Sequence, residues 1–366
     1  MEKDKILAIL AGVVHPGEKK DIVSLGMVED VRAEDGKIRF TLNFPKARDP
    51  LAGSVKKAAE ETLAAAFPEY RGNIAVLVKE AAPKKAEKPE RKTSTGGIRN
   101  LIAVSSAKGG VGKSTVTANL AVALTRQGYR VGILDADVYG PSMPKMFGIE
   151  GSLPTVEITD DGRELIVPPE SEGIKIMSIG FFIKPDDALI WRGAMATNAL
   201  RQLIHQTKWD DLDFLLIDMP PGTGDIHLTI VQELAVTGAV IVSTPQQVAL
   251  ADVVRGISMY RAENIAVPVL GLIENMAWFT PAELPENKYY IFGKEGMKAL
   301  AEKEKLPLLG QIPLVQSVCE SGDAGRPVAA DDTITGLAFG KLAEEFVRQV
   351  EIRNATREAT RRVEVK

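Results

Sequence analysis

The fold of this chain is decided by the stretch Ser106-Ala107-Lys108-Gly109-Gly110-Val111-Gly112-Lys113-Ser114-Thr115. It follows an apolar run at residues 101–105 and precedes a helical pattern from about Ser114 to Gln127. A strand, a glycine-rich turn and a helix in this order form a phosphate-binding loop, or P-loop. Its glycines let backbone N–H groups converge on an anion, and the helix N-terminus adds partial positive charge. The stretch therefore predicts a site for a nucleoside triphosphate, rather than a turn without a ligand.

The side chains of this loop have separate expected tasks. Lys113 would reach the β- and γ-phosphates of ATP, and the Ser114 hydroxyl would bind Mg²⁺. ATP and Mg²⁺ are therefore the expected cofactors. The other nucleotide contacts of the loop are expected from Ala107, Lys108, Gly109, Gly110, Val111, Gly112 and Thr115.

Two acidic motifs end apolar runs further along the chain. In Leu134-Asp135-Ala136-Asp137, Asp137 is the candidate for positioning the attacking water, and Asp135 is expected to support the loop or the Mg²⁺ shell. The run 214–217 ends on Asp218, as a Walker B strand does, and Asp218 would hold Mg²⁺. The segment 220–224, Pro-Pro-Gly-Thr-Gly, is expected to sense the γ-phosphate. One strand-end aspartate more often caps a helix, but this series behind a P-loop predicts ATP hydrolysis.

The pattern around these motifs predicts an α/β fold. From residue 99 onward, short apolar runs alternate with helical stretches, which indicates a mainly parallel sheet with helices on both faces. The expected strands are 101–104, 131–134, 214–217, 239–242 and 269–273. Residues 1–80 predict a small α+β domain ahead of this sheet. Its expected helices are 4–10 and 51–66, and its expected strands are 22–28, 37–44 and 73–78.

Two other segments complete the expected domain organisation. Residues 81–98 are rich in lysine, proline and glutamate and predict a mobile linker. A helical pattern at 336–352 is expected to pack on the sheet as the last helix of a P-loop domain of residues 99–352. The tail 353–366 is expected to fray.

Composition narrows the class of protein. Hydrophobic residues make up 45% of the chain and charged residues 26%, as in globular proteins with a buried core. The net charge of -4 gives no general attraction to nucleic acid or acidic lipid, so we expect no nucleic-acid partner and no stable membrane association. The N-terminus lacks a secretory signal, and the single cysteine, Cys319, fits a reducing compartment. We expect a cytoplasmic protein.

The P-loop departs from the ordinary pattern, because Ala107 takes the place of its first glycine and an extra lysine, Lys108, follows. This form resembles the deviant Walker A motif of the MinD/Mrp superfamily, in which the early lysine reaches the nucleotide of the other subunit. The resemblance implies a homodimer that encloses ATP. It also implies a catalytic role for Lys108 beside Lys113 and Asp137.

The fuller resemblance is to Mrp/ApbC-type iron–sulfur cluster carriers. Residues 8–70, which include His15-Pro16-Gly17-Glu18, resemble the small iron–sulfur assembly domain of that family. The resemblance implies cluster transfer to apoprotein clients and makes Asn275 a candidate for adenine contact; the alternative for Asn275 is a cap at a strand end. The blocks that carry it over residues 100–330 are Asp135–Ser142, Trp191–Gly193, Asp218–Asp225, Thr244–Gln246, Glu274–Met276 and Ile291–Gly293.

One departure concerns the cluster. The family has a Cys-Pro-x-Cys pair shortly after the Asn-Met dipeptide, whereas the segment 275–293 contains no cysteine. A dimer would offer only two thiols, both Cys319, and clusters commonly take four thiolates. We expect Cys319 to be a small packing residue. The three histidines, which share no metal-ligand spacing, are expected to be satisfied or solvated imidazoles: His15, His205 and His227.

Three functions therefore compete. The first is an ATPase that takes part in iron–sulfur cluster delivery, with the cluster held by unusual ligands, by thiols of a partner, or not at all. The second is a dimerisation switch of the ParA or MinD kind without cluster carriage. The third is a metabolite kinase, for which the sequence reveals no acceptor site. The resemblance favours the first.

Overall fold

The structure, a computed structural model, describes residues 2–34, 36–44, 51–70, 72–80, 97–159, 162, 164–183, 193–281, 283–284 and 286–360. The chain divides into two compact units, the first of residues Met1–Glu90 with Glu351–Glu358 and the second of the remaining residues, and the break after residue 90 lies outside the described part. Most of the expected linker 81–98 therefore lies outside it, as do Trp191 and Arg192. Ile98 is fully buried in a core of the second unit, so that unit begins before residue 99.

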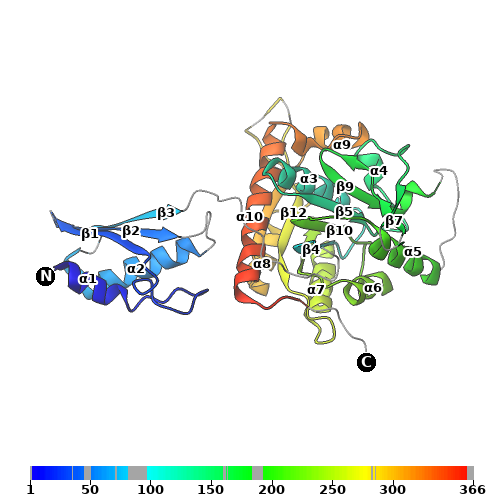
Figure 1. The fold of residues 1–366 in the computed structure, drawn as a ribbon. Coiled ribbons are helices and arrows are strands. Elements are labelled where there is room, and N and C mark those ends of the chain that lie inside the picture. Colours follow the sequence, from blue (N-terminus) through cyan, green and yellow to red (C-terminus); the bar gives the residue numbers. More distant parts are fainter. Residues whose placement is uncertain are drawn as a thin grey trace. The chain divides into compact units, whose positions relative to one another are not determined.

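The first unit is a three-stranded sheet with two helices against one face (Figure 1). The strand order is β1-β2-β3, with β1 antiparallel and β3 parallel to β2. Every second side chain of β2 is buried, from Ile38 to Phe44, which is the alternation expected of a half-covered strand. The elements are α1 (Glu2–Leu10), β1 (Val28–Glu34), β2 (Lys37–Phe44), α2 (Ala52–Ala66), η1 (Pro68–Tyr70) and β3 (Ile74–Glu80).

The strand expected at residues 22–28 is wrong, because this segment is a series of turns and β1 begins only at Val28. Oδ1 of Asp21 accepts hydrogen bonds from the N–H groups of Val23 and Ser24, at 3.1 and 2.7 Å. Gly26 has a φ of +66°, which closes the turn. Local hydrogen bonds from an aspartate thus compete successfully with strand pairing.

The second unit is built on an eight-stranded sheet with the order β13-β12-β11-β4-β10-β5-β9-β8. All neighbours are parallel except β8, which is antiparallel to β9. The predicted, mainly parallel sheet is confirmed, and β9 and β13 extend it beyond the five expected strands. Its strands are β4 (Asn100–Ser105), β5 (Val131–Asp135), β8 (Glu170–Ser171), β9 (Ile174–Ser178), β10 (Phe214–Asp218), β11 (Gly238–Ser243), β12 (Val269–Phe279) and β13 (Leu308–Leu314). A separate antiparallel pair consists of β6 (Thr155–Ile158) and β7 (Glu164–Val167).

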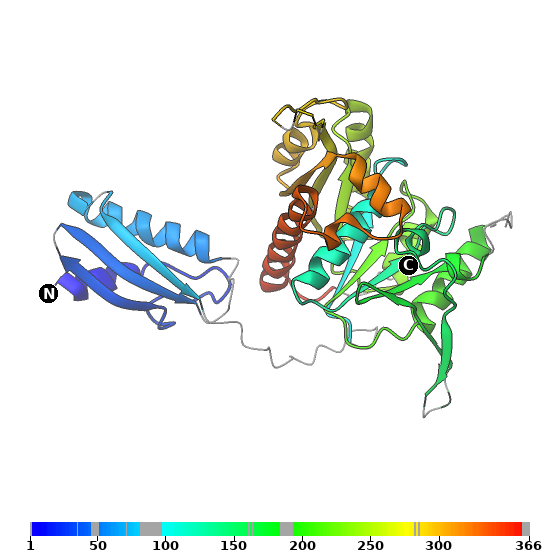
Figure 2. The same ribbon diagram turned by 90° about the horizontal axis from the view of Figure 1, so that it is seen from above.

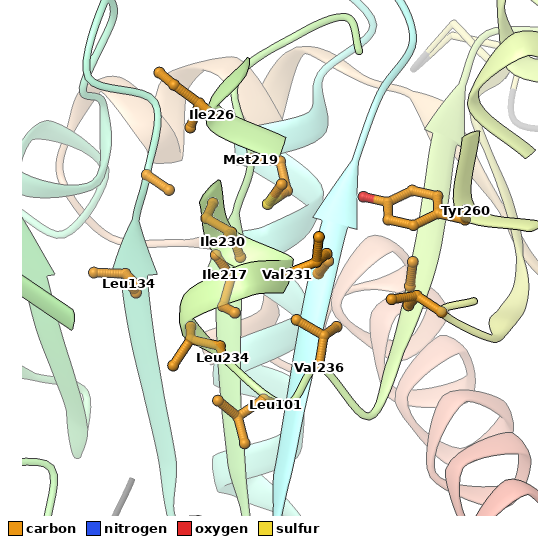
Figure 3. Close-up of a cluster of buried hydrophobic side chains, with 14 of the residues drawn as sticks. Leu101, Leu134, Ile217, Met219, Ile226, Ile230, Val231, Leu234, Val236 and Tyr260 are labelled. Atoms are coloured by element: carbon orange, nitrogen blue, oxygen red, sulfur yellow. The ribbon is translucent and has the colours of Figure 1, made fainter. Parts of the chain in front are cut away.

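Helices cover both faces of this sheet. Successive residues of a strand point to opposite faces, so alternate residues belong to two separate hydrophobic cores. Leu101 and Ala103 of β4 belong to one core, and Ile102 and Val104 belong to the other. Figure 3 shows the first core, in which α6 packs over the strands. Around the first core lie α5 (Gly193–Gln206), α6 (Asp225–Glu233), α7 (Gln247–Arg261) and α8 (Gly296–Glu304). Around the second lie α3 (Lys113–Arg126), α4 (Met143–Met146), η3 (Val328–Ala330) and α10 (Ile334–Thr356). The short elements η2 (Ile179–Phe181) and α9 (Gln316–Asp323) complete the unit.

The last helix, α10, packs on the sheet as predicted but is longer than expected. It continues to Thr356, so the expected tail 353–366 begins too early. Leu342, Phe346 and Val350 are buried in the second core, whereas Leu337 is 59% exposed. Figure 2 shows α10, the red helix, along one side of the second unit. Within the described part of the chain, no helix has both the length and the apolar character needed to cross a membrane.

These two leucines of α10 provide a matched test of its packing. We expect Leu342→Ala to lower the free energy of unfolding by about 2–5 kcal/mol, because it leaves a cavity in the core. Leu337→Ala should change it by less than about 1 kcal/mol. Urea unfolding followed by tryptophan fluorescence measures this unit alone, since the tryptophans are Trp191, Trp209 and Trp278. Equal losses in the two variants would contradict the packing of α10.

Candidate functional site

The P-loop lies where the sequence places it, between the end of β4 and the start of α3. Gly110 and Gly112 have φ values of +78° and +79°, a region that L-residues with side chains rarely adopt. At Gly112 there is also no room, since a Cβ atom would lie 2.3 Å from Nδ2 of Asn275. The loop therefore requires glycine at position 112 for its conformation and for its close contact with β12.

The loop lysine and the Walker B aspartate meet in a buried network. Nζ of Lys113 lies 2.6 Å from Oδ2 of Asp218, and the two side chains are 6% and 0% exposed. The Ser114 hydroxyl donates to the same carboxylate oxygen at 2.7 Å and accepts from Nζ of Lys113 at 3.0 Å. The structure thus brings together the three residues that the sequence assigned to phosphate and Mg²⁺.

A fourth residue of this network, Thr117, was not anticipated. Its hydroxyl lies 2.7 Å from the other carboxylate oxygen, Oδ1 of Asp218, and the side chain is fully buried. The signal for it is its spacing, because Thr117 follows Lys113 by four residues on α3 and so points to the same side of the helix. With it, both oxygens of Asp218 have donors from α3.

Asp135 supports the loop after β5, which is one of the two roles expected for it. Its carboxylate accepts hydrogen bonds from the N–H groups of Ser142 and Met143 and from the Ser178 hydroxyl, at 2.9–3.2 Å. It pairs with Asp218 across the neighbouring strands β5 and β10. Burial, followed by the charge of Asp218, raises the pKa of Asp135 to about 7. The residues 136–142 are thereby tied to the sheet.

Asp137 stands at the edge of a cleft beside the P-loop. Burial raises the pKa of its carboxyl, and the charge of Lys113 acts in the opposite direction. The cleft has a volume of about 460 Å³ and lies between the loops that follow β5 and β10. Its walls include Asp137, Tyr139, Pro220, Pro221 and His227. This position suits the expected role of Asp137, which stays a prediction.

The remaining loop residues differ in exposure. Lys108, Gly109 and Gly110 are exposed, and no described residue forms an ion pair with Lys108. Asn275 is 6% exposed and donates from Nδ2 to the Val111 carbonyl at 2.9 Å. Asn275 therefore braces the P-loop, and its contact with adenine stays a prediction. It lies inside β12, so it does not cap a strand end.

The donors present suit Mg²⁺ and a polyphosphate. Ser114 and Thr117 offer hydroxyl oxygens and Asp218 a carboxylate, which are hard ligands of the kind that Mg²⁺ prefers. The exposed backbone of Gly109 and Gly110 leaves N–H groups accessible to an anion. The site therefore fits a magnesium–nucleotide complex.

The donors present do not suit a resident iron–sulfur cluster. Among the described residues, no three histidine, cysteine or acidic side chains are grouped so that they could hold a metal ion. Cys319 is exposed on α9, so the expectation that it packs in a core is wrong. The segment after β12 is instead held by a bridge between Phe279 and Tyr289 and by Lys288, whose Nζ lies 4.0 Å from the Trp278 ring centroid.

Two of the three histidines agree with the expectation, and the third does not. Nδ1 of His15 accepts from two backbone N–H groups, and the exposed His205 lies 2.8 Å from Glu233. These two fit satisfied or solvated imidazoles. His227 does not, because its side chain is 2% exposed and neither ring nitrogen has a hydrogen-bond partner.

Each of the two units matches the model of a known protein family. Residues 97–348 match the family model described as NUBPL iron-transfer P-loop NTPase, and residues 3–76 match that of an iron–sulfur cluster assembly protein. The chain is 40% identical over 349 residues to the iron–sulfur cluster carrier protein of Synechocystis, covering 95% of this chain and 97% of that protein.

Solved structures agree with this assignment. A nucleotide-binding protein from Archaeoglobus fulgidus, in complex with ADP, superposes with a TM-score of 0.54 at 42% identity, covering 63% of this chain and 87% of that one. MinD of Pyrococcus horikoshii, complexed with Mg-ADP, superposes with a TM-score of 0.50 at 25% identity, covering 70% and 98%. With its P-loop network and its N-terminal assembly-type unit, the chain belongs to the family of NUBPL-type iron-transfer P-loop NTPases.

Proposed function

We propose that this chain binds ATP with Mg²⁺, hydrolyses it, and uses this cycle in transferring iron–sulfur clusters to apoproteins. The observation that carries the proposal is the buried network of Lys113, Ser114 and Asp218 behind an exposed P-loop backbone. Relatives that match nearly the whole chain are named iron–sulfur cluster carrier proteins, which supports the transfer role.

The residues have distinct tasks in this proposal. The P-loop amides and Lys113 hold the phosphates, while Ser114 and Asp218 hold Mg²⁺, whose charge stabilises the charge developing on the phosphoryl oxygens. Asp137 positions the attacking water from the neighbouring cleft. Lys108, which is exposed, reaches the nucleotide of a second copy of the chain in a homodimer. Two nucleotides are then enclosed between two subunits.

The cluster is cargo in this proposal, and its thiolates come mainly from a partner. The chain has one cysteine, so a homodimer supplies two thiols where a cluster commonly takes four. Glu283 and Glu286, in the segment where the family has its cysteine pair, are exposed carboxylates. Carboxylates match hard ions better than the soft iron–sulfide core. A partner protein or the client itself is therefore the source of the missing ligands.

A second candidate is a nucleotide-driven dimerisation switch that carries no cluster. It is favoured by the segment 275–293, which has no cysteine and contains a backbone β-bridge between Phe279 and Tyr289 and a cation–π contact of Lys288 with Trp278. The nucleotide cycle is the same in both candidates, so only the cluster distinguishes them.

The two lysines of the P-loop allow a test of the nucleotide site and of the dimer. Lys113→Ala should abolish ATP binding in calorimetry, because the phosphates lose their buried cation. Lys108→Ala should keep ADP affinity but lower ATP turnover by about 10²–10³-fold, since its charge acts only in the assembled dimer. Wild-type turnover per chain should rise with protein concentration.

Two results would contradict these assignments. Undiminished turnover of Lys108→Ala, independent of protein concentration, would show that this lysine does not act across a dimer. Normal ATP binding by Lys113→Ala would remove the nucleotide site from the P-loop. In Lys113→Ala the buried Asp218 loses its cation, which could destabilise the fold. Thermal unfolding of each variant therefore serves as the control that the protein is folded.

Anaerobic reconstitution tests the source of the thiols. With iron and sulfide alone, the chain should bind far less than one cluster per dimer, and Cys319→Ser should behave like the wild type. With a client apoprotein present, ATP should accelerate cluster insertion into that client. A full cluster that disappears in Cys319→Ser would show instead that the chain holds clusters itself. No effect of the chain or of ATP on insertion would favour the dimerisation switch.

A further inference from the structure

The buried Thr117 holds one oxygen of the Asp218 carboxylate by itself. Its hydroxyl donates to Oδ1 of Asp218 at 2.7 Å, and both side chains are 0% exposed. Lys113 and Ser114 bond to the other oxygen, Oδ2, at 2.6 and 2.7 Å. Among the described residues, Oδ1 has no second donor. Loss of the Thr117 hydroxyl would therefore leave this oxygen unpaired in a place that solvent does not reach.

The bond from Thr117 exceeds what a threonine in a helix needs for itself. Such a hydroxyl commonly donates to the carbonyl four residues earlier, as Thr125 of the same helix does to Ala121 at 3.0 Å. Thr117 lies at the same distance of 3.0 Å from the Lys113 carbonyl. Its bond to Asp218 is shorter and has a charged acceptor, so it is the stronger of the two. The single proton of the hydroxyl therefore goes to the carboxylate.

The three donors of Asp218 have different tasks once a nucleotide is bound. In the proposed function Lys113 holds the phosphates and Ser114 holds Mg²⁺, so the partners of Oδ2 rearrange. Thr117 has no task at the nucleotide, because its side chain is fully buried one helical turn beyond Lys113. The bond to Oδ1 is therefore the one that can stay the same with and without nucleotide.

A fixed Oδ1 determines where the other oxygen lies. The carboxyl group of an aspartate turns easily about its last side-chain bond, because this torsion has a broad energy profile. The bond from Thr117 restricts that rotation and keeps Oδ2 beside the Ser114 hydroxyl. Mg²⁺ demands near-ideal octahedral geometry, so its binding depends closely on the position of each ligand oxygen.

Resting on the proposed binding of ATP with Mg²⁺, we propose that Thr117 is a positioning residue that sets the affinity for the metal through Asp218. Its hydroxyl orients Oδ2 toward Ser114 and touches neither the nucleotide nor the metal. The effect is the same for ATP and ADP, because the Thr117–Asp218 bond involves no phosphate. Thr117 therefore controls the part of the nucleotide affinity that depends on Mg²⁺, and the part measured without metal does not depend on it.

Substitutions at Thr117 separate metal positioning from packing. Thr117→Val keeps the shape of the side chain and removes the hydroxyl, whereas Thr117→Ser keeps the hydroxyl. Thr125→Val is the matched control on the same helix, because the Thr125 hydroxyl bonds, among the described residues, to a backbone carbonyl alone. Calorimetric titrations with ADP, in a chelator and at a series of Mg²⁺ concentrations, give the Mg²⁺ midpoint, which is the concentration at which half of the gain in ADP affinity is reached.

We expect Thr117→Val to raise the Mg²⁺ midpoint by about 10- to 100-fold, as the loss of a group that orients a metal ligand does. ADP affinity in the chelator should stay nearly unchanged. ATP turnover should need correspondingly more Mg²⁺ and recover most of kcat when the metal is saturating. Thr117→Ser should restore most of the midpoint, and Thr125→Val should behave like the wild type.

Several results would overturn the positioning role. One is a wild-type midpoint in Thr117→Val, and another is an equal shift in Thr125→Val. A third is a parallel loss of metal-free ADP affinity and thermal stability that Thr117→Ser does not restore, which indicates packing. Thr117→Ala, which also lacks the hydroxyl, replaces Thr117→Val if the latter does not fold. Wild-type protein whose ADP affinity does not respond to Mg²⁺ would refute the proposed metal site itself, before any variant is compared.

Discussion

The buried carboxylate of Asp218 is the group on which the nucleotide site depends. It lies at the end of β10, between β4 and β5 in the sheet, where no water solvates it. A carboxylate in such a place is strongly unfavourable unless cations and hydrogen-bond donors surround it. Lys113, Ser114 and Thr117 meet this need, and all three belong to α3. The first turn of α3, and with it the P-loop, is therefore held against the centre of the sheet.

The same constraint explains why the neighbouring aspartate has a different role. Asp135 pairs with Asp218 across β5 and β10, so the two carboxylates repel each other in a region of low solvation. The cation goes to Asp218, and Asp135 is left to backbone N–H groups and the Ser178 hydroxyl. Because those N–H groups belong to Ser142 and Met143, the loop that carries Asp137 is anchored at its far end. The end of β10 therefore holds the P-loop through Asp218, and the end of β5 holds the following loop through Asp135.

Local patterns predicted the parts of this arrangement that depend on neighbours in the chain. The P-loop, the strand that ends on Asp218 and the helix after the loop are each encoded within a few residues, and the structure contains them. The buried imidazole of His227 was not foreseen, because its burial depends on α6 packing against loops from two distant strands. The turn after Asp21 was read as a strand because apolar residues such as Ile22 and Met27 are buried in turns as well. The apolar pattern indicates which residues are buried, whereas the hydrogen bonds that the backbone makes, here with Asp21, decide whether the segment is a strand or a turn.

The nucleotide site and the segment after β12 are held together by independent interactions, which bears on the missing cysteine pair. β4, β10 and α3 form the phosphate site through Asp218, and Asn275 connects it to β12 through one hydrogen bond to Val111. Beyond that point, the Phe279–Tyr289 bridge and the Lys288–Trp278 contact stabilise the chain without any metal ligand. The hydrogen bonds of the phosphate site therefore do not depend on a cysteine pair in this segment. Asn275 is the residue through which β12, the strand that leads into this segment, contacts the P-loop.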